Sequence, residues 1–213
     1  MKKKLILMCV AGVLVMTAII GGTLAGFNTA TENKGVTNIT VKALGIEMLG
    51  TDNGNLEQAN AGKAKPGGEM ELVKNIQNNV EGGYTLYTRV TIDKKWSDET
   101  LDASKIHLYV GSGDNKVELT AGTTVNDWIV WYVDAEQVVL YYTKPLEQGQ
   151  SSTNFVETLS FDADMDNAYA GKEALIDFSA DAVQTIAAED SIPSEWGVYP
   201  VFNEDGTIAA IEE

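Results

Sequence analysis

The sequence has few of the residues from which enzymes build their usual reactive sites. It holds one cysteine and one histidine in 213 residues. Cys9 lies in an apolar run near the N-terminus, so the rest of the chain cannot form a disulfide and depends on its own core for stability. A lone histidine, His107, without a His-Glu-x-x-His motif excludes a conventional zinc-protease site. Cysteine and serine triads have no recognisable motif either.

Positive charge is also scarce. The chain has 15 basic residues, of which Arg89 is the only arginine, against 31 acidic residues, and its net charge is −16. This balance argues against nucleic acid and against anionic membrane surfaces as partners. It is typical of a soluble extracellular protein, although acidity alone more often serves solubility than a specific function.

Residues 1–25 have the three parts of a secretory signal peptide. Lys2, Lys3 and Lys4 precede the uncharged apolar run Leu5–Ile20, and small residues at Thr23-Leu24-Ala25 follow Gly21-Gly22. We predict a signal helix that is cleaved between Ala25 and Gly26. A retained membrane anchor is the alternative, because the uncharged stretch continues to Phe27, but no positive charges follow it. Cleavage would leave 12 basic against 31 acidic residues, a net charge near −19.

Period-2 alternation dominates the remaining chain and predicts β-strands. The clearest run is Tyr84–Trp96, in which Tyr84, Leu86, Val90, Ile92 and Trp96 share one face, with Thr88 and Lys94 in phase. A second candidate, Val36–Met48, changes phase near Gly45, which suggests a bulge. The other candidates are Met70–Ile76, Ile106–Val110 with Lys116–Leu119, Trp128–Val133 with Gln137–Thr143, Phe155–Phe161, Ala174–Val183, and Val198–Phe202 with Thr207–Ile211.

This pattern predicts an all-β fold, an antiparallel β-sandwich of jelly-roll type behind the N-terminal signal helix. Short helices are predicted over Asp98–Ser104 and Val183–Glu189, and a loop over Leu49–Gly68. The predicted organisation is a signal peptide at 1–25, a sandwich domain at 26–187 and an acidic C-terminal tail with a short hairpin at 188–213.

Several segments, taken in order, resemble the TasA/camelysin family. The export signal ending in Gly21–Asn28 is similar to the family's signal, which a SipW-type signal peptidase cleaves. Lys65–Gly68, a strand, Asn78-Asn79 and a long alternating strand follow the family's order, although Gly68 stands where Asp is usual. Tyr141–Ser151 resembles a second turn of the family, and Ala180–Gln184 resembles the run that closes its domain.

The resemblance implies a jelly-roll sandwich exported to the cell surface or biofilm matrix. In the fibre-forming members it also implies assembly by strand donation. The name camelysin is attached to a claimed metalloprotease, but this sequence does not supply the ligands of such a site in a recognisable arrangement.

The best metal candidate is an acidic loop. Asp162, Asp164, Asp166 and Glu173 occupy positions 1, 3, 5 and 12 of an EF-hand spacing, which would suit Ca²⁺. No helices flank this loop and Asn167 replaces the turn glycine, so a solvated acidic loop is favoured and no cofactor is predicted. His107 is out of phase with its apolar neighbours and is interpreted as a solvent-facing strand residue.

Four tryptophans could in principle form a carbohydrate platform. They are Trp96, Trp128, Trp131 and Trp196. Trp96 and Trp128 are interpreted instead as core residues, since aromatic side chains at strand spacing usually pack inside.

We therefore predict a secreted, non-enzymatic structural protein of the cell surface or biofilm matrix. Its partners would be itself or a related matrix protein, besides the export signal peptidase, and it would meet the membrane only through the uncleaved signal. In residues 26–49, Ile39, Val41, Leu44 and Ile46 are the predicted side chains of a donated strand. Three alternatives remain open: the segment is the first strand of its own sandwich, the protein is a monomeric surface binding module, or it is a camelysin-like metalloprotease.

Overall fold

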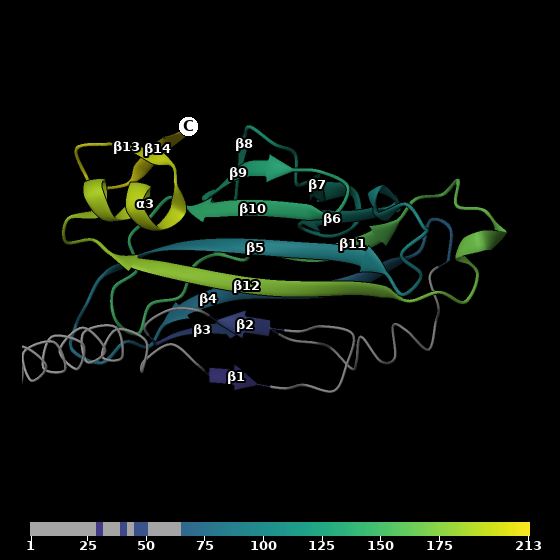
Figure 1. Cartoon of the computed structure of the whole chain (residues 1–213), viewed down its shortest axis with the longest axis horizontal. Coiled ribbons are helices and arrows are strands. Elements are labelled where there is room, and N and C mark those ends of the chain that lie inside the picture. The colour runs from purple at the N-terminus through teal and green to yellow at the C-terminus, as the bar shows by residue number, and fades with distance from the viewer. Residues whose placement is uncertain (1–28, 32–38, 42–44, 51–64) are drawn as a thin grey trace, which may run out of the picture.

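A computed structural model describes residues 29–31, 39–41, 45–50 and 65–213, and this part of the chain is an all-β protein with one α-helix (Figure 1). A seven-stranded sheet contains, in spatial order, β1 (Thr29–Thr31), β2 (Ile39–Val41), β12 (Ala174–Gln184), β5 (Leu86–Trp96), β10 (Gln137–Tyr142), β9 (Trp128–Val133) and β8 (Thr123–Val125). A five-stranded sheet contains β3 (Ile46–Leu49), β4 (Glu69–Asn78), β11 (Val156–Phe161), β6 (Ile106–Val110) and β7 (Val117–Glu118).

The two sheets share one hydrophobic core. Along the strands of each sheet, every second side chain points inward into this core. Aromatic rings pack against one another there: the centroid of Phe155 lies 5.4 Å from that of Trp128 and 5.9 Å from that of Phe178. Six of the seven residues that were predicted to share a face are buried, namely Leu86, Thr88, Val90, Ile92, Lys94 and Trp96. The seventh, Tyr84, precedes β5 and is 43% exposed, so the prediction is wrong at this end of the run. The period-2 reading of this strand is therefore confirmed.

All described strand pairings except one are antiparallel. The exception is β2, which runs parallel to β12 with Ile39 opposite Phe178 and Val41 opposite Ala180. The predicted hairpins also form: β6 pairs with β7, and β9 pairs with β10 through a register shift at Val139/Leu140.

The predicted single strand Val36–Met48 is wrong, because its described parts lie in two different sheets. β2 belongs to the seven-stranded sheet and β3 to the five-stranded sheet. The chain turns at Gly45, which has a φ of +60°, and a Cβ there would lie 3.1 Å from Cα of Val80. The phase change near Gly45 thus marks a change of sheet rather than a bulge.

Both predicted helices are corrected. In Asp98–Ser104 the structure has only the 3₁₀ turn η1 (Ala103–Lys105), whose first residues are capped by the Asp102 carboxylate. The second prediction, Val183–Glu189, overlaps the end of β12, and the helix α3 (Ala188–Trp196) begins after it. Two further 3₁₀ turns are η2 (Gly113–Asn115) and η3 (Asn167–Tyr169).

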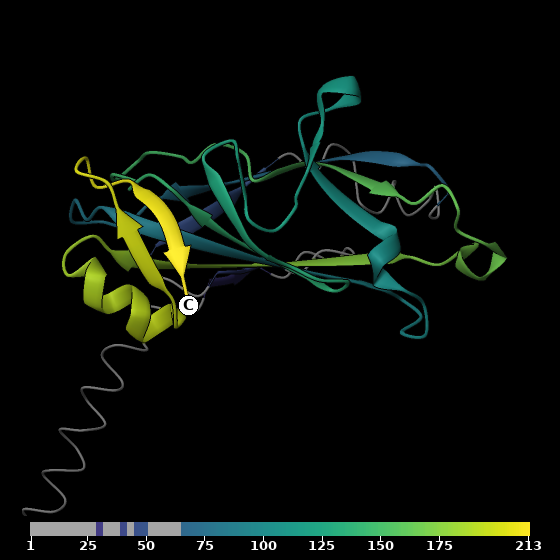
Figure 2. The ribbon, with the colours of Figure 1, turned by 90° about the horizontal axis from the view of Figure 1, so that it is seen from above.

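The segment predicted as an acidic tail is folded onto the seven-stranded sheet. We call residues 188–213 the C-terminal module: it contains α3 and a separate two-stranded sheet of β13 (Tyr199–Phe202) and β14 (Ile208–Glu212), which confirms the predicted hairpin. In Figures 1 and 2 the module lies at one end of the molecule, beside the C-terminal end of β12. α3 ends at Gly197, in the left-handed conformation that commonly terminates a helix.

Candidate functional site

The edges of the two sheets are built very differently on the two sides of the sandwich. On one side, the described edge strands are β7 and β8, which have two and three residues and come from the connection between β6 and β9. Short, turn-bounded strands of this kind are a common way to keep a sheet edge from pairing with another chain.

On the other side, the N-terminal part of the chain supplies the edges of both sheets. β1 and β2 lie beside β12, and β3 lies beside β4 (Figure 1). β12 and β4 are 11 and 10 residues long, so the residues before Gly50 shield two of the longest strands in the molecule.

In the described part of the chain, this shielding covers part of each long strand. β5 pairs with all 11 residues of β12, whereas β2 pairs with three of them, Phe178–Ala180. β3 pairs with the last four residues of β4, Asn75–Asn78. Among the described residues no strand pairs with the remainder of these two edges.

The predicted donor residues fall into two groups. Ile39 and Val41 lie in β2, and Leu44 lies outside the described residues. Ile46 is 6% exposed and belongs to the main core of its own chain, as a resident strand requires. Gly50 then passes close to β4, since a Cβ at this position would lie 2.0 Å from the carbonyl oxygen of Val73.

The predicted cleavage site between Ala25 and Gly26 lies outside the described residues. Within the part of the chain that the structure describes, no helix is long and apolar enough to cross a membrane.

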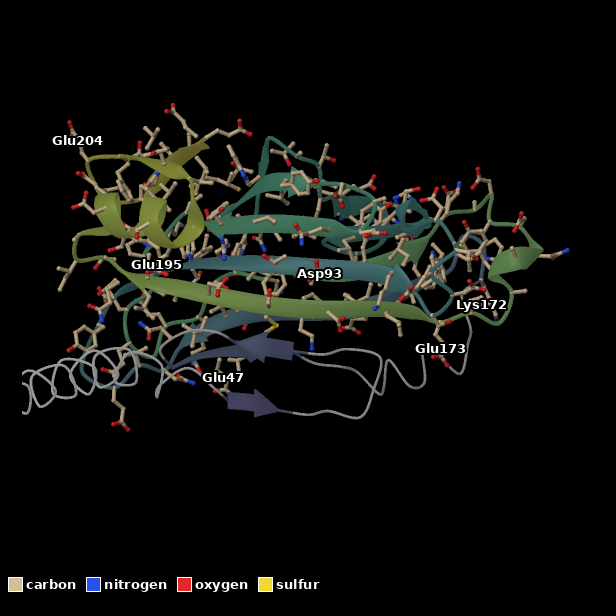
Figure 3. The ribbon with its side chains drawn as sticks, viewed as in Figure 1. Glu47, Asp93, Lys172, Glu173, Glu195 and Glu204 are labelled. Carbon is tan, nitrogen blue, oxygen red and sulfur yellow. The ribbon has the colours of Figure 1, made fainter. Side chains whose placement is uncertain are left out.

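The acidic loop does not assemble a calcium site. Asp162 and Asp164 both bond the Lys105 ammonium, at 3.1 and 2.6 Å, and Asp166 caps η3 by accepting from the Ala168 N–H. Glu173 lies beside Lys172 (Figure 3). No three histidine, cysteine or acidic residues among those described come together as metal ligands.

The electrostatics of this loop have local causes. Hydrogen bonds from the backbone N–H of Asp164 and from the Lys105 ammonium lower the pKa of Asp162 to about 2. In turn, the carboxylates of Asp164 and Asp162 raise the pKa of Lys105. Asp98 behaves similarly, because hydrogen bonds from Lys172 and Thr100 lower its pKa to about 2. These are surface ion pairs that stabilise charge, and they do not prepare a proton donor or acceptor for chemistry.

His107 lies on the outer face of β6, as predicted. Its Nδ1 is 2.7 Å from a Glu118 carboxylate oxygen and its Nε2 is 3.8 Å from Asp162, while its ring is tilted towards Tyr109. The contact with Glu118 joins β6 to β7 and has a structural role.

The tryptophans do not form a carbohydrate platform. Trp96 and Trp128 are buried in the main core, which confirms their interpretation as core residues. Trp196 belongs to α3 of the C-terminal module and is buried in the core between the module and the seven-stranded sheet, where Trp131 is partly buried.

A surface cavity of about 470 Å³ lies between β4, β11 and the turn after β6. Its acidic side chains include Glu69 and Glu157, which are already engaged: Glu69 bonds Lys116, and Glu157 accepts from the Gly111 N–H and from Asn154. Both of these carboxylates therefore serve contacts within the fold.

The contact that sequence reasoning missed lies between the C-terminal module and the outer face of the seven-stranded sheet. The Arg89 guanidinium bonds Asp181 at 2.6 Å and lies 5.5 Å from the ring centroid of Trp196. Tyr141 packs against Trp196 at 5.5 Å between ring centroids. The only sequence signal for this contact was a solitary arginine in an acidic protein.

No protein-family model matches the chain, and neither does any curated protein or any solved structure.

Proposed function

We propose that this chain is a secreted structural subunit of the cell surface or biofilm matrix, which assembles by donating its N-terminal strands to a neighbouring copy. The two facing sheets would form a jelly roll, and a SipW-type signal peptidase would release the subunit at Gly26, as the resemblance to the TasA/camelysin family implies. The partner would be a second copy or a related matrix protein.

One observation carries the proposal. In the described part of the chain, the N-terminal segment shields β12 through three residues of parallel pairing, whereas β12 is paired along its whole length on its other side. Parallel pairing is slightly less stable per residue than antiparallel pairing, and three pairs are easily exchanged. The same segment from another copy could make the same hydrogen bonds and extend further along β12.

Charge supports the segment 26–44 as the donor. It carries Lys34 and Lys42 against Glu32, whereas residues 45–213 hold 10 basic and 30 acidic residues. Two acidic bodies repel each other, so a donor with a small positive charge is the part of the chain best suited to approach a second body. Ile46 is left out of the donated set because β3 contributes it to its own core.

A peptide of residues 26–44 tests the acceptor edge. Added in excess to polymerising chains that begin at Gly26, it should occupy β12 of the end subunits and shorten the fibres seen by electron microscopy. A scrambled peptide of the same composition is the control, because it keeps the charge and loses the alternation. Equal fibre lengths with both peptides would contradict strand donation.

Export has an independent test. The protein recovered from the medium should begin at Gly26, within a residue or two, on N-terminal sequencing. A surface-bound form that keeps Met1–Ile20 would contradict release and would favour a membrane anchor.

A further inference from the structure

The C-terminal module has a core of its own, separate from the core between the two main sheets. The sheet contributes Tyr87, Ile129, Tyr141 and Val183 from its outer face, and the module contributes Ala188, Ile192, Trp196, Val198, Ile208 and Ile211. The three buried residues of α3, Ala188, Ile192 and Trp196, are spaced by four and form one stripe of the helix. The module therefore fits this face as one amphipathic unit.

Side chains and a few single hydrogen bonds hold the module in place. The Tyr87 hydroxyl donates to the Gly206 carbonyl at 2.5 Å, and the Ile208 N–H donates to the Thr143 carbonyl at 2.7 Å. Among the described strands, β13 and β14 pair only with each other. The module can therefore leave the sheet without breaking any strand ladder.

The connection between β12 and α3 is short and strained. It consists of residues 185–187, and Ala187 has a φ of +59°, a left-handed conformation that a residue with a Cβ disfavours. Ile186 beside it is 73% exposed, although it is a large apolar residue. Burying Ile186 and releasing Ala187 would both favour a different path of the chain at this point.

We propose that residues 185–187 are the hinge of a C-terminal domain exchange, in which the module of one copy packs on the outer face of the seven-stranded sheet of a second copy. The occupant is a second copy because the chain itself already presents both complementary surfaces. An exchanged dimer repeats every contact of the module and changes only the hinge, and it is symmetric because each copy gives and receives one module. Short strained hinges are known to favour such exchange.

Geometry limits the form of the dimer. Three extended residues span roughly 10 Å, so the two hinges must pass side by side and the two sheet faces must lie close together. The exchange uses the end of β12 and the outer sheet face, whereas strand donation uses the edge of β12. The two contacts are therefore independent, and either one can fail without the other.

The absence of cysteine after residue 25 allows a direct test by disulfide cross-linking. The chain that begins at Gly26 is made with Thr143→Cys alone, with Ile208→Cys alone, and with both, since the backbones of these residues meet at 2.7 Å. The doubly substituted chain should close a disulfide within itself, which shows that the geometry allows the bond. The two single variants are then mixed, incubated at high concentration and oxidised.

Exchange predicts a disulfide that joins one Thr143→Cys chain to one Ile208→Cys chain, identified by mass. The proposal is overturned if the double variant closes its internal disulfide but the mixture gives no more mixed dimer than the disulfide dimers that form by chance between two identical single variants. Peptide mapping distinguishes this bond from any contact through the N-terminal strands.

Matched hinge variants give the second measurement. Ala187→Gly removes the penalty of the left-handed conformation from the closed monomer. Under conditions where only a small fraction of the chains is dimeric, the dimer fraction should therefore fall by roughly tenfold or more. Ala187→Pro fixes φ near −65° and should raise that fraction, because the closed hinge no longer fits. If the Gly variant leaves the dimer fraction unchanged, the hinge does not drive exchange and the proposal is wrong.

Discussion

Replacing a buried threonine with valine should make this protein more stable at one position and less stable at another. Thr88 is the third residue of β5 and is fully buried, and its hydroxyl oxygen has no hydrogen-bond partner among the described residues. Burying a hydroxyl without a partner costs about 1–3 kcal/mol in protein mutational data. Valine has nearly the same shape and is equally suited to a strand, so Thr88→Val should raise the free energy of unfolding by about 1–2 kcal/mol.

Thr158 is the matched control. It is 5% exposed in β11, and its hydroxyl donates to the Gly111 carbonyl at 2.7 Å. Thr158→Val removes the donor and leaves that carbonyl without this bond, so it should lower the free energy of unfolding by about 1–2 kcal/mol. The same chemical change thus has opposite signs at the two positions.

Thermal melts followed by circular dichroism measure the difference. For a domain of this size, 1 kcal/mol shifts Tm by roughly 2–4 °C, so Thr88→Val should melt several degrees above the parent and Thr158→Val several degrees below it. If Thr88→Val destabilises the protein as much as Thr158→Val does, the Thr88 hydroxyl has a partner and the reasoning is refuted.

Three further predictions concern the module, the ion pairs and the acidic loop. Trp196→Ala should cost the module about 3–5 kcal/mol of packing, so limited proteolysis should cut at residues 185–187 while the main core stays folded; an unchanged cleavage pattern would contradict this. Because the pKa of Asp162 lies at about 2 against an ordinary 3.8, its ionised form contributes stability that is complete above pH 4 and is lost as pH falls towards 2. In the variant Lys105→Met, a carboxyl titration by NMR should find the pKa of Asp162 raised. An unchanged pKa would show that Lys105 is not one of its causes. Millimolar Ca²⁺ should leave Tm unchanged, and a rise of several degrees that Asp164→Ala abolishes would overturn the interpretation of the loop.

Where one physical rule decided the structure, the sequence was a reliable guide. β5 shows this most clearly, because six residues at period 2 face the core. They include Lys94, which is buried despite its charged ammonium group. Its ammonium donates to the Ile106 carbonyl at 2.7 Å, and burial lowers its pKa. The long aliphatic stem packs like an apolar residue, so the phase of the strand outweighs the charge.

The sequence failed where a second layer covers a sheet. Tyr87 and Tyr141 alternate as outward residues, yet both are buried because the C-terminal module lies over them. The module was hidden because α3 has only three buried residues and contains Pro193, which weakens a helical pattern. Its many acidic residues suggested a solvated tail, but they lie on the surface of the module while the apolar residues between them face the sheet.

The N-terminal segment shows a different limit. Val36–Met48 has the composition of one strand, and only Gly45 signals that the chain changes sheet there. Which long strand each half joins depends on contacts with β12 and β4, which are distant in sequence. No local pattern could have predicted a parallel pairing with β12.

The central claim is that residues 26–44 join one copy to the next while β3 remains in its own fold. Sedimentation velocity of the chain 26–213, compared with the matched chain 45–213 at the same concentration, tests it most directly. Strand donation predicts that the longer chain sediments as a concentration-dependent polymer and that the shorter chain sediments as a folded monomer. Two monomers, or two polymers of the same size, would contradict it.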